Sequence, residues 1–125
     1  MANAAMTQST VVELQDGSTR KMDFDMGALA QAEMVYEDRF GKSVGVDAII
    51  AELIMGKARA MMAFAYGAMI SAGEKVTWKE FCGSVWTFEN YEQLHAVVLG
   101  AVLRMMHSGS TEGSAEKNAS SRGAV

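Results

Sequence analysis

The sequence predicts a mainly α-helical protein that begins with a short β-hairpin, continues as a compact bundle of about four helices and ends in a disordered tail. Three observations predict this class. The chain has no proline to interrupt helices, apolar residues recur at helical spacing from residue 27 to about 106, and only residues 10–24 alternate as a strand pair does. With 125 residues, half of them apolar, the chain is long enough for one core, so a single domain over residues 10–107 is expected.

The predicted hairpin occupies residues 10–24. Two alternating segments flank Asp16 and Gly17, a pair typical of two-residue turns because both positions tolerate positive φ. Residues 1–9 carry no charge and few bulky groups, so a flexible N-terminus is expected there.

The helices are predicted from apolar spacing and from their end signals. Asp25 stands where an N-cap would precede a helix over residues 27–40, and Gly41 is a stop signal. The longest pattern, residues 47–71, is apolar nearly all round from Ala60 to Gly73, which predicts the central helix of the domain or one covered by a partner. Thr77 and Glu80 have capping-box spacing and start a short third helix.

A last helix is expected to end near Met106, with a buried stripe that includes Leu94, Val98 and Val102 and a capping relation between Asn90 and Gln93. Residues 108–125 hold no aromatic residue and a single valine, so they are expected to be disordered. The charges of this tail cancel, as do those of residues 1–21, and the net charge of −4 therefore lies within residues 22–107.

Composition disfavours several classes of function. A negative net charge disfavours binding to nucleic acid or to anionic membranes, and the apolar stretch between Arg59 and Glu74 is shorter than the roughly 20 residues of a membrane-spanning helix. One cysteine, Cys82, cannot form an intrachain disulfide, which fits a reducing cytoplasm. It is expected to be a small apolar filler.

No catalytic, cofactor-binding or metal site is predicted. His95, His107 and Cys82 are not spaced as two metal ligands on one helix face would be. His95 is instead expected to flank the buried stripe of the last helix, and His107 to lie at the C-terminus of that helix. The chain has no phosphate-binding loop and no nucleophile motif. Acidic residues gather between Asp23 and Asp38, where Asp23 and Asp25 could in principle form an acid and base pair, but a solvated face and a helix cap explain them more simply.

Methionine is the unusual residue, with 11 copies. Flexible methionine side chains fill cores, and they also form surfaces that repack around different apolar partners. A partner-binding groove is therefore hypothesised on the long helical pattern, with these four residues as candidates: Met55, Met62, Tyr66 and Met69.

Two motifs carry a resemblance to a known family. They are Met-Asp-Phe-Asp-Met-Gly-Ala-Leu-Ala-Gln-Ala-Glu at residues 22–33 and Val-Thr-Trp-Lys-Glu at residues 76–80, with an apolar helix between them and another helix after them. In this order they resemble the tail assembly chaperones of siphovirus-type bacteriophages and of gene transfer agents.

The resemblance implies a protein of the host cytoplasm that is absent from the mature virion. Such a chaperone binds the tape measure protein, keeps it soluble and helps to recruit tail tube protein, in this family often through a longer, frameshifted form. Self-association without the partner is also expected, from the apolar character of residues 60–73. Two alternatives remain, a structural tail or connector component of the phage and a small helical regulator that sequesters a partner protein. An enzyme is the weakest alternative.

Overall fold

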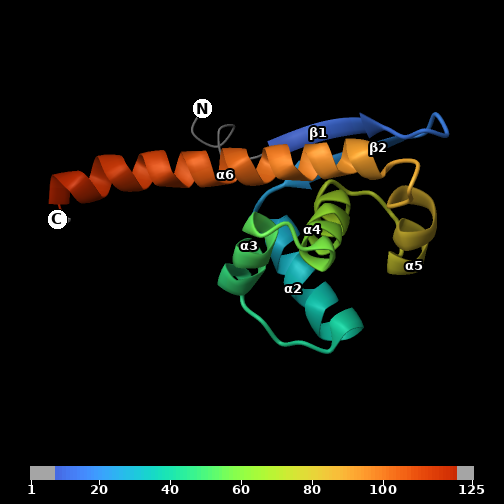
Figure 1. Ribbon diagram of the computed structural model, residues 1–125, viewed down its shortest axis with the longest axis horizontal. Helices are drawn as coiled ribbons and strands as arrows, with labels where there is room; N and C mark the ends of the chain where they lie inside the picture. Colours follow the sequence, from blue (N-terminus) through green and yellow to red (C-terminus); the bar gives the residue numbers. More distant parts are fainter. Residues whose placement is uncertain (1–7, 121–125) are drawn as a thin grey trace.

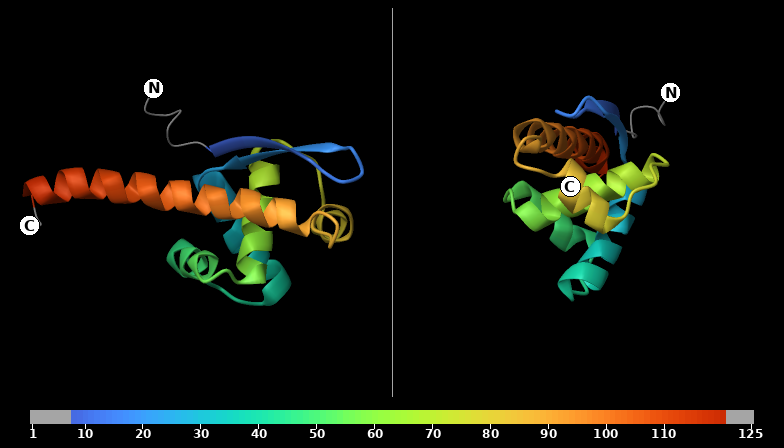
Figure 2. Two further views of the ribbon diagram at one scale, coloured as in Figure 1. Left: turned by 45° about the horizontal axis from the view of Figure 1, so that its top comes forward. Right: turned by 90° about the vertical axis from the view of Figure 1, so that its right-hand side faces the viewer.

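The computed structural model describes residues 8–120 and shows a mainly helical protein with an N-terminal hairpin, as predicted. Helix α4 (Ala58–Ser71) lies at the centre, between α2 (Met26–Phe40), α3 (Val46–Ile54) and the short α5 (Trp78–Glu80) (Figure 1). The long helix α6 (Tyr91–Ser120) and the hairpin run alongside each other over this group, as the side view in Figure 2 also shows.

The hairpin pairs β1 (Gln8–Glu13) with β2 (Thr19–Phe24) in antiparallel register, with Thr10 opposite Met22. Its first strand begins at Gln8, two residues earlier than expected, and the rest of the predicted flexible N-terminus lies outside the described residues. The predicted two-residue turn is wrong: the Leu14 N–H donates to the Ser18 carbonyl at 2.8 Å, so the loop has three residues, 15–17. Gly17, at φ +90°, takes the left-handed position that such a loop requires.

Helix α2 has the predicted N-cap and the predicted end, and it begins one residue earlier than expected, at Met26. The Asp25 carboxylate accepts a hydrogen bond from the Ala28 N–H at 2.9 Å and a second from the Ser71 hydroxyl at 2.8 Å. Gly41 closes the helix in the left-handed conformation at φ +67°. Asp25 is thus a cap that also connects the start of α2 to the end of α4. The Asp23 carboxylate has a different partner, since it accepts a hydrogen bond from the Ser9 hydroxyl. The two acids are not joined as an acid and base pair.

The single helix expected over residues 47–71 is two helices, α3 and α4. Gly56 has φ +74°, and the Lys57 N–H donates to the Glu52 carbonyl while the Gly56 N–H donates to the Leu53 carbonyl. These bonds form a Schellman-type helix end, which a glycine makes without steric strain. The apolar pattern continues across this break because both helices bury apolar residues in the same core.

A bidentate ion pair closes the corner between α3 and α4. The Arg59 guanidinium donates to both Glu52 carboxylate oxygens, at 2.9 and 2.7 Å, and the Tyr36 hydroxyl donates to one of them at 2.7 Å. The hydrogen bonds from Arg59 and then from Tyr36 lower the pKa of Glu52 from its usual 4.5 to about 2. Desolvation and the neighbouring Glu52 raise the pKa of Tyr36. The cluster joins α2, α3 and α4.

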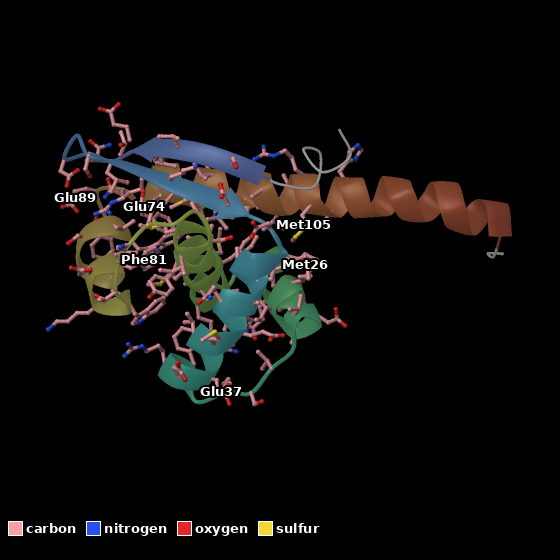
Figure 3. All side chains as sticks on the ribbon, turned by 180° about the vertical axis from the view of Figure 1, so that it is seen from behind. Met26, Glu37, Glu74, Phe81, Glu89 and Met105 are labelled. Atoms are coloured by element: carbon pink, nitrogen blue, oxygen red, sulfur yellow. The ribbon has the colours of Figure 1, made fainter. Side chains whose placement is uncertain are left out.

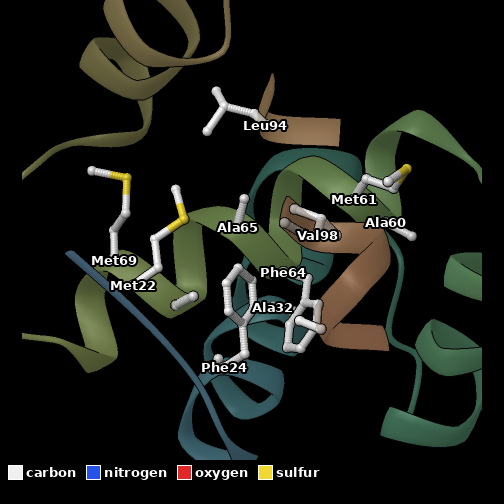
Figure 4. Packing of buried hydrophobic residues seen from close by; sticks show 14 of the residues in the cluster. Met22, Phe24, Ala32, Ala60, Met61, Phe64, Ala65, Met69, Leu94 and Val98 are labelled. Carbon is white, nitrogen blue, oxygen red and sulfur yellow. The ribbon is translucent and has the colours of Figure 1, made fainter. Parts of the chain in front are cut away.

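Helix α4 is the central helix of the core. This is one of the two predictions made for the apolar segment 60–73, the other being a helix covered by a partner. Its side chains pack against the hairpin, α2 and α6, and the ring of Phe64 meets that of Phe24 edge to face at 5.0 Å (Figure 4). Helices α2 and α4 approach so closely that a Cβ on Gly67 would lie 2.3 Å from the Ala28 carbonyl oxygen. Alanines at positions 28 and 32 of α2, both fully buried, permit this approach.

The predicted capping box at the start of α5 is confirmed. The Glu80 N–H donates to the Thr77 hydroxyl, and the Thr77 N–H donates to the Glu80 carboxylate. A single π-helical turn, Phe81–Val85, follows directly. Turns of this type insert an extra residue into the helical spiral and are frequent at functional sites.

The predicted capping relation between Asn90 and Gln93 is wrong, because both side chains bind other elements. The Asn90 side chain, buried, accepts a hydrogen bond from the Gln15 N–H at 2.8 Å and donates to the Val85 carbonyl at 3.0 Å. Gln93 donates to the Glu13 carbonyl of β1. These bonds attach the start of α6 to the hairpin.

Helix α6 has the predicted buried stripe, including Leu94, Val98 and Val102, but it continues beyond Met106 to Ser120. The helical backbone thus enters the segment for which disorder is predicted. Its last turns extend past the other elements (Figure 1). Residues 121–125 lie outside the described residues.

Candidate partner-binding surface

The four candidate residues of the long helical pattern do not form one surface. Met69 is fully buried and belongs to the core, so it offers no surface to a partner. Met55 is exposed, but it caps α3 and is separated from the others by the break at Gly56. Met62 and Tyr66 are half-buried and pack against the core. The helix break at Gly56 separates Met55 from the other three residues, and on α4 itself the surrounding elements bury Met69 in the core.

Tyr66 lies at one side of a small polar groove between α2 and α5. The groove has a volume of about 140 Å³, and its lining includes Met34, Arg39 and Trp78. The Tyr66 hydroxyl donates to the Val76 carbonyl at 3.2 Å, and burial raises the pKa of this phenol. Tyr66 therefore supports the packing of α5, and replacing it would disturb the fold as well as the groove.

Aromatic rings lead in a continuous chain from the core to the surface at the start of α6. The buried ring of Phe81 stacks on Trp78 at 5.5 Å and packs against Trp86 at 6.0 Å. Trp86 meets Tyr91 edge to face at 6.2 Å, and Tyr91 packs against His95 at 5.4 Å. The outer rings are consequently held in place by rings that are fixed in the core.

The outer rings border a pocket of about 450 Å³, here called the aromatic pocket. Its lining residues come from the π-helical turn, the following loop and the first turn of α6: Cys82, Trp86, Thr87, Phe88, Glu89 and Tyr91. Phe88 is 98% exposed. Cys82 is also exposed rather than the buried filler that was predicted, and partial burial raises the pKa of its thiol. The surface of this pocket is mainly apolar.

An exposed ridge continues from this pocket along α6. The α6 ridge consists of Tyr91, His95, Leu99, Leu103 and Met106. The first four are spaced by four residues, so they form one row that turns slowly around the helix. Leu99, Leu103 and Met106 are 39%, 57% and 40% exposed. Gln93, which binds the hairpin, lies about 120° around the helix from Leu99, so the ridge does not face the hairpin.

The sequence carried two signals for this surface that the predictions missed. Three aromatic residues, Trp86, Phe88 and Tyr91, fall within six positions, which is dense for a connecting segment. On α6, Leu99 and Leu103 lie beside the predicted buried stripe and widen the apolar arc beyond what one core contact needs. Their exposure is decided by the tertiary structure.

The remaining ionisable groups show no cluster typical of a metal site. Among residues 9–107, whose side chains the structure describes, no three His, Cys, Asp or Glu side chains are placed to hold a metal ion together. His95 flanks the buried stripe as expected, but His107 lies inside α6 rather than at its C-terminus because the helix is longer. No helix of the described residues is long and apolar enough to cross a membrane.

Comparison of the chain with protein-family models, with curated proteins and with solved structures finds no match.

Proposed function

We propose that this protein is a tail assembly chaperone without a catalytic site of its own, which binds the tape measure protein and keeps it soluble in the host cytoplasm. The resemblance of residues 22–33 and 76–80 to this family suggests the process. The observation that carries the binding role is the α6 ridge, whose Leu99, Leu103 and Met106 remain exposed after the core is complete. Exposed apolar groups of this kind mark surfaces for partners.

The form of the ridge fits a helical partner. Its apolar residues recur at spacings of four and three, which matches the row of side chains that a second helix presents. Each of the three is about half exposed, so complete burial would contribute about 3 kcal/mol before the costs of ordering. An acidic domain surface would keep the complex soluble. Recruitment of tail tube protein is part of the proposal through the family resemblance alone.

Co-expression with the tape measure protein encoded in the same gene cluster tests the proposal. The soluble fraction of the tape measure protein and its co-purification are measured with the parent chain and with Leu99→Glu combined with Leu103→Glu. The parent should keep the partner soluble, and the double variant should lose most of this effect because two carboxylates would have to be buried in the contact. Met62 and Tyr66 are poor test positions because both pack against the core.

A matched control adds the same two charges elsewhere. Val11→Glu combined with Ala30→Glu changes exposed residues on β1 and α2, away from the ridge, and should leave the partner soluble. Far-UV circular dichroism checks that both double variants are folded. Equal solubility with the ridge variant and the parent would contradict the proposed surface, and detection of this protein in purified virions by mass spectrometry would instead favour a structural tail component.

A further inference from the structure

We propose that the aromatic pocket receives an apolar side chain of the partner helix that has a lysine or arginine next to it. This inference rests on the proposed function, since it names the chemistry of the partner at one end of the α6 ridge. Tyr91 belongs to both the pocket and the ridge. A helix lying along the ridge would therefore reach the pocket with one of its own side chains.

The apolar part of the inference follows from the rings around the pocket. Phe88 is almost fully exposed, so nearly all of its ring is in contact with water, and Trp86 and Tyr91 also line the space. Covering such rings removes apolar surface from water, and aromatic residues in pockets are common anchors of interfaces. An apolar side chain is the group that this lining binds best.

The pocket is ready to bind because its floor is rigid. Trp86 packs against Phe81, which is fully buried, and Phe81 in turn stacks on Trp78. The Trp86 N–H also donates to the Phe81 carbonyl at 2.8 Å, across the π-helical turn. A preorganised pocket loses little conformational entropy when it is filled, which favours binding.

The charge at the rim indicates the neighbour of that apolar side chain. Glu89 lines the pocket and makes no hydrogen bond or ion pair with another residue of the described chain. A second hollow shares Thr87 and Glu89 with the pocket and adds Asp16, and neither lining contains a lysine or arginine. A partner carrying a basic residue beside its apolar anchor would complement this rim, whereas an acidic neighbour would be repelled.

Two synthetic peptides test the inference directly. Both are amphipathic helices of about 15 residues, a length at which an isolated helix becomes marginally stable, with the same leucine pattern and either lysine or glutamate at the polar positions. Binding to the full chain is followed by isothermal titration calorimetry and by tryptophan fluorescence, because Trp86 lines the pocket. The lysine peptide should bind at least about tenfold more tightly than the glutamate peptide.

Variants locate the binding on the molecule. Phe88→Ala should weaken binding of the lysine peptide about tenfold or more, and Glu89→Lys about two- to fivefold, the range expected of an exposed charge pair. Glu37→Lys makes the same change of charge on α2, at the other end of the body (Figure 3), and should bind like the parent. Unchanged binding by both pocket variants, or equal binding of the two peptides, overturns the inference.

The two proposals can fail separately. If Phe88→Ala keeps the tape measure protein as soluble as the parent does while the ridge variant fails, the pocket inference is wrong and the proposed function stands. If the ridge variant also keeps the partner soluble, the proposed surface is wrong whatever the peptides show.

Discussion

Replacing Gly67 with alanine changes the point where α2 and α4 come closest. A Cβ at this position would lie 2.3 Å from the Ala28 carbonyl oxygen and 3.1 Å from the Gln31 Cβ. A carbon to oxygen contact normally needs about 3.3 Å, so the helices would have to separate by roughly 1 Å. The contacted atom is backbone, and no side-chain rotation can relieve the overlap.

The expected destabilisation is about 2 kcal/mol. Overpacking of a well-packed core costs about 1 to 3 kcal/mol, and the upper end applies because a backbone must move. Alanine is favoured over glycine inside a helix by about 1 kcal/mol, which offsets part of this cost. For a chain of this size the net change corresponds to a fall in Tm of about 8 °C.

Gly100→Ala is the matched control. It lies inside α6, where the atom nearest to a new Cβ is the end of the flexible Arg104 side chain at 3.5 Å. It should stabilise the protein by up to about 1 kcal/mol through helix propensity alone. Urea unfolding followed by circular dichroism measures both variants. A Gly67→Ala variant as stable as the parent would refute the close packing of α2 and α4.

Three further substitutions test the contacts between elements. Glu52→Gln should destabilise the protein by about 1 kcal/mol near neutral pH. Because folding lowers the pKa of Glu52, the parent should lose its extra stability over the variant as the pH falls from 4.5 toward 2. Urea unfolding of both proteins at several pH values measures this difference. Asn90→Leu should cost about 1 to 3 kcal/mol, because the Gln15 N–H loses its acceptor, and should speed amide hydrogen exchange at Gln15. Asp25→Ala should cost about 1 kcal/mol by removing the cap on the Ala28 N–H, measured as a lower Tm, while Asp25→Asn should retain most of the stability.

The predictable part of the candidate surface was small. The sequence shows an excess of apolar residues, but it does not show that Met69 lies in the core whereas Phe88 and Leu103 are exposed. Composition measures how much apolar surface a chain has. Which part stays exposed depends on how many neighbouring elements cover each side of a helix, and α6 is covered on only part of its surface.

Local features were decided by the sequence by itself. The Asp25 cap, the Gly41 stop and the Thr77 capping box depend on hydrogen bonds between residues a few positions apart, so a short sequence window contains all their atoms. The hairpin and the helical class follow for the same reason, from alternation and periodicity.

Other features were decided only by the tertiary structure. The helix end at Gly56, the three-residue loop after Leu14 and the role of Asn90 depend on partners that lie far apart in sequence or on a choice between local conformations of similar energy. Asn90 could have capped its own helix, but its side chain is buried and instead binds the N–H of Gln15, 75 positions earlier. A buried amide left without partners costs free energy, and only the tertiary structure brings both the Gln15 N–H and the Val85 carbonyl to the Asn90 side chain.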